Sequence, residues 1–529
     1  MSDRVLIIDA LSAGDGRRTR SRDSIGCGPR TIAGVFEKKQ IGCRIARSED
    51  ITSRSQLKGF EHLALSAMTM DIPVSRRLVK MWRNANKGRV LVGGPVSSDI
   101  TTVLELVKPD VMIIGEGEVT LEELLKVGFL NDEVDLSEIK GIAYSSSSGP
   151  VVTSERTPIP EGELEKYRPS TFRILDYRAY AASKVYVETV RGCSNYRRTR
   201  LELGTGRMCS ECGGCDADDP GERLDCPEEI PPGCGFCSVP ATWGPPRSRS
   251  TESIVDEVRE LLDLGAHRVV LEAPDFLDYR RGQTPLTDPC YPPANLRAIE
   301  ELLNAIAALD SVSNEDARIS IENVKACLFT EEVARVISDT IPGTSPNIGL
   351  ETGSESHLRA IGKCGSPGDV LQAIQIARRF GMTPFVYLIF GLPGETEETV
   401  DESIRLMQKL SETGAERIIL YGFRALPGSA FEGFPEPTGG HSLGIKMQKA
   451  AAKINRSKKK DYVGRIIRGI AAEESWARHG YTMVYPFDEG PIMTIQGGFS
   501  PGTMLDVEVT EVLSDGLLLG QRVKKNISG

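Results

Sequence analysis

The sequence contains no long apolar run, which excludes the simplest kind of membrane protein. No segment approaches the roughly 18 consecutive apolar residues of a membrane-spanning helix. The first residues run directly into the strand-like segment Val5–Asp9 and lack the pattern of a signal peptide. Excess basic charge is also absent. The net charge is −10, so any nucleic-acid binding would be confined to a local patch. We therefore expect a cytoplasmic protein without a membrane partner.

Cysteine, by contrast, is concentrated in one stretch. Seven of the twelve cysteines lie between residues 193 and 237. Disulfides are rare in the cytoplasm, and thiolates are common ligands of iron–sulfur clusters and zinc, so this stretch predicts metal binding rather than disulfides. The other five cysteines are scattered, and most of them are expected to be buried small residues: Cys27, Cys43, Cys290, Cys327 and Cys364.

The length of 529 residues predicts two to four domains. Residues 1–128 alternate strand-like and helix-like segments, which predicts a Rossmann-like α/β domain with an open parallel sheet. We expect strands at Val5–Asp9, Cys43–Ala46, His62–Ser66, Arg89–Gly93 and Val111–Ile114, and helices at Thr31–Phe36, Val74–Asn84, Ile100–Val107 and Thr120–Val127. Residues 129–180 are a polar connector, with a hairpin predicted at Gly141–Thr153.

Residues 181–425 contain a second strand–helix series, with strands expected at Tyr186–Val190, Arg268–Glu272, Arg318–Glu322, Asn347–Glu351, Phe385–Phe390 and Arg417–Tyr421, and helices at Ser253–Leu264, Asn295–Leu309, Glu331–Asp339, Pro367–Phe380 and Glu398–Thr413. Six units are predicted, too few for a complete eight-unit barrel, so we expect a partial (β/α)6 barrel of the TIM type. Residues 426–457 are predicted to be a linker followed by a helix. Residues 458–529 alternate apolar and polar residues between glycines, beginning with a strand expected at Val463–Ile467, which predicts a small β-barrel. The predicted fold class is therefore α/β and multidomain.

Small residues follow the strands of the first domain, at Ser66, Gly93, Gly94, Gly115 and Gly117. Ligands of open parallel sheets bind beyond the carboxyl ends of the strands. Glycine there lets a large ligand approach the backbone closely. These five residues are therefore candidate cofactor contacts, although each glycine taken alone is also explained by a tight turn.

The segments Leu91–Pro95 and Ile113–Glu118 resemble the cobalamin-binding domain that precedes many radical S-adenosylmethionine (SAM) enzymes. The resemblance implies cobalamin as a cofactor. An Asp-x-His-x-x-Gly motif is missing, and the one histidine of this segment, His62, lies in a strand-like run where a packed residue is expected. Cobalamin would then bind without a protein histidine; alternatively the fold is kept and the cofactor lost.

Two separated segments, Glu188–Cys193 and Gly233–Ser238, resemble the cluster-binding motif of radical SAM proteins that carry a cobalamin domain. The resemblance implies that Cys193, Cys234 and Cys237 hold a [4Fe-4S] cluster whose open iron binds and reduces SAM, giving a 5′-deoxyadenosyl radical. The gap between the first two thiols is forty residues here instead of three, and Cys226 is a competing candidate for the first ligand.

The resemblance to radical SAM proteins continues downstream, through Leu271–Tyr279, Ile348–Glu355, Ile361–Lys363 and Tyr387–Thr396. It implies that Pro274 and Asp275 lie along the methionine part of SAM, that Glu351 contacts SAM or substrate, and that Gly391 and Pro393 shape the turn near the adenine. For Glu351, a strand-end carboxylate in an ion pair is an equally good interpretation.

The insert at residues 194–233 has four thiols at metal-ligand spacing: Cys209, Cys212, Cys215 and Cys226. Adjacent glycines and aspartates suit a loop that folds around a metal. Zinc, a single iron or a second iron–sulfur cluster are all compatible, because the number of thiolates does not select among them.

The C-terminal segment resembles, weakly, the TRAM domain of tRNA methylthiotransferases, through Pro501–Val509 and Gly516–Gly520. Its basic residues Lys458, Lys459, Lys460, Arg465 and Arg468 are candidate phosphate contacts, although a run of charge is more often a solvated face. Three functions follow. The first is a cobalamin-dependent radical SAM methyltransferase that acts on a protein or RNA and takes electrons from a ferredoxin or flavodoxin. The second is a methylthiotransferase-like tRNA-modifying enzyme. The third is a metal-dependent RNA-binding protein without catalysis, which leaves the radical SAM motifs unexplained.

Overall fold

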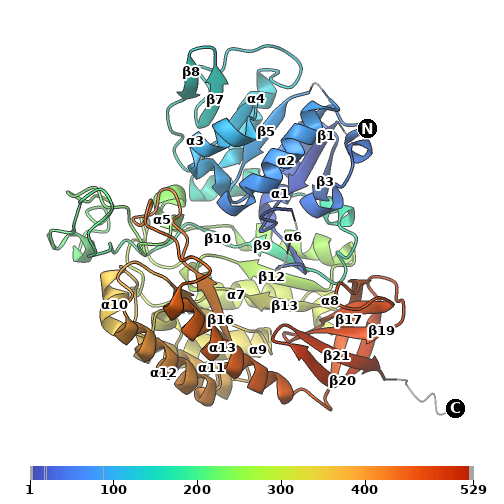
Figure 1. Cartoon of the computed structure of the whole chain (residues 1–529), viewed down its shortest axis with the longest axis vertical. Coiled ribbons are helices and arrows are strands. Elements are labelled where there is room, and N and C mark those ends of the chain that lie inside the picture. The colour runs from blue at the N-terminus through green and yellow to red at the C-terminus, as the bar shows by residue number, and fades with distance from the viewer. Residues whose placement is uncertain (1–3, 17, 19–20, 87, 524–529) are drawn as a thin grey trace. The chain divides into compact units, whose positions relative to one another are not determined.

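The computed structural model describes residues 4–16, 18, 21–86 and 88–523. The chain divides into two compact units, Met1–Val187 with Glu252–Gly265, and Glu188–Thr251 with Ala266–Gly529 (Figure 1). Among the described residues, no helix is both long enough and apolar enough to cross a membrane.

The first unit is built on one seven-stranded sheet. Five strands run parallel in the order β3-β1-β4-β5-β6, the arrangement of flavodoxin-like sheets, and β7 and β8 extend it as an antiparallel hairpin. The strands are β1 (Val5–Asp9), β3 (Cys43–Arg47), β4 (His62–Ser66), β5 (Val90–Gly93), β6 (Val111–Ile113), β7 (Ile142–Ser146) and β8 (Gly149–Val152). The hairpin predicted in the connector therefore forms one edge of this sheet.

The predicted helices of this unit are present as α1 (Cys27–Lys38), α2 (Ile72–Arg83), α3 (Ile100–Thr102), which continues as the π-helix η5 (Val103–Val107), and α4 (Gly117–Lys126). Helix α1 packs against α4, and α2 packs against η5. Helix α1 begins four residues earlier than predicted. The sequence does not signal this start, because the first turn, Cys27-Gly28-Pro29, lacks good helix formers and the N-cap residue, Gly26, makes no side-chain hydrogen bond.

The helix α6 (Thr251–Asp263) also packs in the first unit, although it follows the cluster motif in sequence. Its buried Glu257 accepts a hydrogen bond from the buried Arg30 of α1 at 2.9 Å. The short strands β2 (Ser24–Ile25) and β9 (Lys184–Glu188) pair in parallel.

The second unit contains the partial barrel. Its parallel strands form two groups, β12-β13 and β14-β15-β16. A β-bridge between Val324 and Ile348 joins the two groups. Directly after β9, Thr189 donates its backbone N–H to the carbonyl of Glu272 at the end of β12, which continues the row. The strands are β12 (Arg268–Glu272), β13 (Arg318–Ile321), β14 (Asn347–Glu351), β15 (Phe385–Phe390) and β16 (Arg417–Gly422).

The helices of this unit cover the outside of the strands. Helices α11, α12 and α13 lie side by side, in orange and red in Figure 1. The helices are α5 (Val239–Trp243), α7 (Leu296–Ala307), α8 (Asp310–Ser313), α9 (Glu331–Thr340), α10 (Glu355–Ala360), α11 (Pro367–Arg379), α12 (Glu397–Thr413) and α13 (Ser442–Lys460); the two-residue strands β10 (Val190–Arg191) and β11 (Arg247–Ser248) pair with each other.

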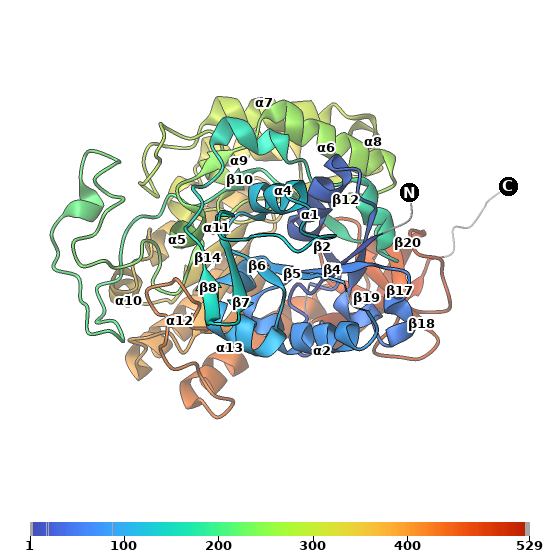
Figure 2. The ribbon, with the colours of Figure 1, turned by 90° about the horizontal axis from the view of Figure 1, so that it is seen from above.

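The insert is a loop with one short 3-10 helix, η8 (Gly214–Asp216), visible in green in Figures 1 and 2. The C-terminal strands close into a barrel in the order β17-β18-β19-β21-β20, with β19 and β21 parallel. They are β17 (Ile466–Glu474), β18 (Tyr481–Pro486), β19 (Ile492–Gln496), β20 (Met504–Ser514) and β21 (Leu517–Arg522). The first strand was predicted at Val463–Ile467 and lies further along the chain, after Gly464 with its φ of +83°.

Candidate active site

Three thiols, those of Cys193, Cys234 and Cys237, line one cavity of about 300 Å³ in the second unit. These are the three thiols that the sequence resemblance implies, even though forty residues separate Cys193 from Cys234. Cys226 does not line this cavity; it packs against an apolar cluster that includes Leu203 and Ile230. The geometry therefore favours Cys193 over Cys226 as the first ligand.

Glycines position both parts of the motif. Gly192, directly before Cys193, has a φ of +91°, and a Cβ there would lie 2.5 Å from the carbonyl oxygen of Gly244. Gly235, inside the Cys-x2-Cys turn, lies against the ring of Phe431, where a Cβ would come within 2.4 Å of the ring. Any other residue at these two positions would displace the neighbouring thiol.

The sulfur atoms receive hydrogen bonds from Asn195. Its backbone N–H donates to Cys193 Sγ at 3.4 Å, and its side-chain amide donates to Cys234 Sγ at 3.3 Å and to the carbonyl of Gly362 at 3.0 Å. Burial raises the pKa of Cys193 to about 12, with Lys325 opposing the shift, and it also raises the pKa of Cys234 and Cys237. A metal that binds here must therefore displace the thiol protons.

A buried ion-pair network fixes the backbone next to Cys193. Lys325 Nζ lies 2.8 Å from carboxylate oxygens of both Asp275 and Asp278, and 2.8 Å from Ser194 Oγ. Ser194 Oγ in turn donates to Asp278 at 2.8 Å, and Arg281 pairs with Asp278 at 2.7 Å. Because Ser194 follows Cys193 in the chain, this network ties the first thiol to the barrel across the long insert.

The same network changes the expected role of Asp275. This side chain is fully buried and does not line the cavity. It accepts from the backbone N–H groups of Leu277, at the start of η9 (Phe276–Asp278), and of Lys325, as well as from Lys325 Nζ. The structure therefore uses Asp275 as an anchor, whereas its neighbour Pro274 does line the cavity. Lys325 and Asn195 belong to no motif and were missed from the sequence.

Glu351 forms an ion pair at the end of its strand, as one interpretation expects, while its contact with SAM or substrate stays a prediction. It lines the cavity, and its carboxylate lies 2.8 Å from Lys363 Nζ. Its backbone has a φ of +68°, in the left-handed region that a non-glycine residue seldom adopts and that is often found at functional sites. Burial alone would lower the pKa of Lys363, but Glu351 together with the nearby Cys234 and Cys364 raises it, so the ammonium group stays charged.

The turn after β15 holds Gly391 and Pro393, neither of which lines the thiol cavity. Gly391 has a φ of +76° and donates to Glu395 at 2.9 Å, while the carbonyl of Pro393 lies 2.8 Å from His357 Nε2. Their contact with the adenine of SAM stays a prediction.

The four insert thiols are placed differently. Cys212 is exposed and the other three are partly exposed. Two of them accept backbone N–H bonds from two residues further on, at 3.4 Å for Cys209 and 3.5 Å for Cys212. Within the described part of the chain, their sulfur atoms do not form a group lying within 4.8 Å of one another. A metal at these residues therefore stays a prediction.

In the first unit, the candidate cofactor contacts lie at the carboxyl ends of β4, β5 and β6, as expected. Gly94 has a φ of +90°, and a Cβ there would lie 2.9 Å from the carbonyl oxygen of Ala67. Gly115, with a φ of +69°, faces open space. The open space beside Gly115 leaves room for a ligand to approach the backbone at this edge. His62 is buried in β4, as predicted, and its Nδ1 accepts the backbone N–H of Arg89 at 3.2 Å.

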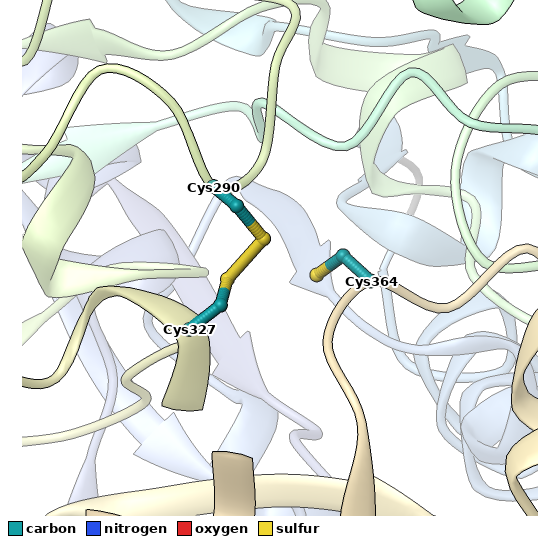
Figure 3. A group of neighbouring side chains, drawn as sticks. All are labelled: Cys290, Cys327 and Cys364. Atoms are coloured by element: carbon teal, nitrogen blue, oxygen red, sulfur yellow. A yellow bond between two sulfur atoms is a disulfide. The ribbon is translucent and has the colours of Figure 1, made fainter.

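One cysteine prediction is wrong. Cys290 and Cys327 form a disulfide, and Cys364 lies beside them (Figure 3). The three come from separate loops of the second unit, and no spacing in the sequence connects them.

The donor set fits an iron–sulfur cluster. Three thiols share one cavity, amide donors face two of the sulfurs, and three thiolates can hold a four-iron cluster while leaving one iron for a further ligand.

Comparison with known proteins agrees with this geometry. Residues 231–407 match the radical SAM superfamily, and residues 22–125 match the B12 binding domain. An uncharacterized protein of Methanocaldococcus jannaschii is 39% identical over 94% of both chains, and one of Methanopyrus kandleri is 38% identical over 99% of this chain and 97% of its own. A putative methylthiotransferase of M. jannaschii is 24% identical over 70% of this chain and 69% of its own.

Two solved structures share the fold. The radical SAM methyltransferase TsrM from Kitasatospora setae, with cobalamin and a [4Fe-4S] cluster bound, has a TM-score of 0.59 and 16% identity over 81% of this chain and 77% of its own. The cobalamin-dependent radical enzyme OxsB, with aqua-cobalamin and SAM bound, has a TM-score of 0.56 and 15% identity over 87% of this chain and 56% of its own. The chain belongs to the radical SAM superfamily and is an enzyme of the kind that carries a B12-binding domain.

Proposed function

We propose that this enzyme is a cobalamin-dependent methyltransferase that methylates an unactivated carbon of a protein or RNA. One observation carries the proposal: a single chain combines a three-thiol cavity in a radical SAM barrel with a flavodoxin-ordered B12-binding sheet. When bound, the cluster, SAM and cobalamin together supply reductive SAM cleavage, hydrogen abstraction and methyl transfer. Electrons would come from a ferredoxin or flavodoxin.

The protein's own residues hold and shield this chemistry. Cys193, Cys234 and Cys237 would ligate the cluster, and Asn195 would keep its hydrogen bonds to two of their sulfurs. The Glu351–Lys363 pair would offer a carboxyl group and an ammonium group to the charged ends of SAM. Apolar side chains complete the cavity wall and exclude water: Phe236, Val239, Leu350, Leu358 and Val370.

Cobalamin binding is tested on the glycine edge. Gly94→Ala should lower the amount of cobalamin that the full-length protein retains, because a Cβ there strains the left-handed backbone and meets Ala67. The matched control is Gly59→Ala, since Gly59 has a φ of +95° but no neighbour within 4 Å. Equal cobalamin retention in the two variants would remove Gly94 from the proposed site.

The reaction is tested by anaerobic reconstitution followed by mass spectrometry of candidate substrates from cells with and without the gene. The proposal expects a gain of one methyl group that requires cobalamin. A gain of a methylthio group without cobalamin would instead favour the methylthiotransferase alternative, which the putative methylthiotransferase relative and the C-terminal barrel support. The non-catalytic alternative does not suit a radical SAM enzyme.

The basic residues of the C-terminal barrel and of the helix before it indicate which class of substrate to expect. Lys459 was a candidate phosphate contact, but it is buried, and burial lowers its pKa to about 8. The guanidinium of Arg468 stacks on Phe487 at 4.4 Å, as does that of Arg318 at 4.8 Å. These groups therefore offer less to an RNA backbone than the sequence predicts, which favours a protein substrate.

A further inference from the structure

Three cysteines outside the proposed cluster site gather in the second unit. We call Cys290, Cys327 and Cys364 the thiol trio (Figure 3). Cys290 lies in the loop between η9 and α7, Cys327 in the 3-10 helix η10 (Ala326–Leu328), and Cys364 between α10 and α11. In the part of the chain that the structure describes, this is the one group of three metal-ligating side chains whose ligand atoms all lie within 4.8 Å of one another.

We propose that the thiol trio, once the Cys290–Cys327 disulfide is reduced, binds a single thiophilic divalent cation such as zinc or ferrous iron. A dithiol reductant would supply two electrons and two protons, ending as a disulfide itself, and the S–S bond would become two thiols. The cation would then displace thiol protons to solvent and form three metal–sulfur bonds.

The spacing favours a single ion over a cluster. Tetrahedral zinc with Zn–S bonds of about 2.3 Å holds its sulfur atoms roughly 3.8 Å apart. Cys290 and Cys327 are close because they are bonded, but Cys364 Sγ also lies within 4.8 Å of both of their sulfur atoms, so reduction would leave three thiols near enough to share one ion. A four-iron cluster attaches each thiolate to a different iron and spreads them more widely. The cavity thiols Cys193, Cys234 and Cys237 do not form a group within 4.8 Å, so the two sets differ in the way that a cluster and a single ion require.

The loop that carries Cys290 is held in place without a metal. Asp288 accepts the backbone N–H of Cys290 at 2.9 Å, and its other oxygen pairs with Arg223 of the insert at 3.1 Å. Arg281 donates to the carbonyls of Asp288 and Pro292. The trio is therefore positioned by the fold, unlike the insert thiols.

Cys364 connects the thiol trio to the cavity of the cluster thiols. Cys364 is buried and lines the same cavity as the three cluster thiols, next to Lys363 and near Lys325. Three thiolates and a divalent cation carry a net charge of −1, which these ammonium groups would offset. Three protein ligands leave a fourth position for an outside ligand, as in catalytic zinc sites. The proposed ion would thus lie at the wall of the active cavity, available to a substrate donor atom.

The test counts zinc bound to full-length protein in which Cys193, Cys234 and Cys237 are all replaced by alanine, which removes the cluster. After treatment with a dithiol under anaerobic conditions and addition of zinc alone, we expect one equivalent more zinc than without the dithiol. Cys364→Ser added to this background should lose that equivalent, while Cys43→Ser, a buried thiol of the first unit, should not.

A second measurement covers the case in which a variant folds poorly. Cobalt(II) bound to the reduced protein should show thiolate-to-metal charge-transfer absorption that Cys364→Ser weakens and that Cys212→Ser, in the insert, changes independently. Zinc content that is the same with and without reduction, or that survives Cys364→Ser unchanged with the cobalt spectrum unaltered, would overturn the proposal.

Discussion

The cavity thiols and the insert thiols lie in one continuous stretch of chain, yet the fold treats them differently. Around Cys193 and Cys234 the backbone is fixed by glycines, by Asn195 and by the buried Lys325 network. The insert is anchored mainly at its base, where the buried Arg198 donates to the carbonyls of Tyr196, Arg223, Leu224 and Ile230. Of its four thiols, Cys212 is exposed and the other three are partly exposed.

The difference separates two ways to build a metal site. The cavity thiols are placed by tertiary structure before any metal arrives, so their geometry belongs to the barrel. The insert has almost no regular structure around its four thiols, so a site there would take more of its shape from the metal. Four predictions test this distinction, beginning with the largest expected effect.

The largest effect is expected at the cavity. Cys234→Ala should reduce SAM cleavage to background, a loss of about 10⁶-fold or more if the enzyme has an ordinary rate enhancement. The measurement is 5′-deoxyadenosine formation under strong reductant. Cys226→Ala should leave this activity in place. If instead Cys226→Ala abolishes cleavage and Cys193→Ala does not, the cavity geometry has been misread.

The next effect concerns the buried network beside Cys193. Lys325→Met leaves Asp275 and the partly compensated Asp278 buried without the ammonium group. Removing one partner of a buried ion pair costs about 3–5 kcal/mol, so the free energy of unfolding should fall by that amount in urea titration. Lys409→Met, at an exposed position of α12, is the control. A change as small as in the control would show that the network does not hold the first thiol.

The insert should be separable from catalysis. Cys212→Ala should lower the metal content of the insert, because one of four predicted ligands is lost, while 5′-deoxyadenosine formation stays close to that of the unaltered enzyme. Metal analysis and activity are measured on the same sample. Cys209→Ala gives the stricter test: if it abolishes the SAM-binding cluster itself, the two groups of thiols form one site and the comparison fails.

The smallest expected effect is a change of protein stability with pH that comes from Asp278, in the buried network beside Cys193. Burial would raise the pKa of Asp278, but Lys325 and Arg281 outweigh it and hold the pKa below its usual 3.8. A depressed carboxyl pKa contributes stability that is present above the unfolded value and lost as the pH falls through the folded value. Unfolding titrations below pH 4 should therefore show a decline of about 1 kcal/mol per unit of pKa difference, which Asp278→Asn removes.

Much of the fold could be predicted from local patterns. The strands β12, β14 and β15 lie where their apolar runs predicted, and α11 and α12 begin within one residue of prediction, behind capping boxes at Ser366 and Thr396. Such signals are local, so they survive in the sequence. The packing of α6 against Arg30 could not be predicted, because it depends on a partner more than two hundred residues away.

The candidate site likewise contains residues that local motifs predict and residues that only the fold brings into the site. Cys234 and Cys237 carry a short motif, and Gly94 follows a recognisable strand. Lys325 carries no motif, and Asp275 carried one that suggested a ligand contact, whereas the structure buries it in an ion pair. A side chain whose partners lie far away in the sequence belongs to no residue spacing that could identify it.

The sequence by itself determined the two α/β units, the small barrel and the radical SAM motifs, since each depends on residues close together in the chain. Only the tertiary structure decided that Cys193 shares a cavity with Cys234 across forty residues, that Asp275 turns inward, and that Cys290, Cys327 and Cys364 meet. The physical reason is that parallel strands bring the loops at their carboxyl ends together, whatever length of chain lies between them.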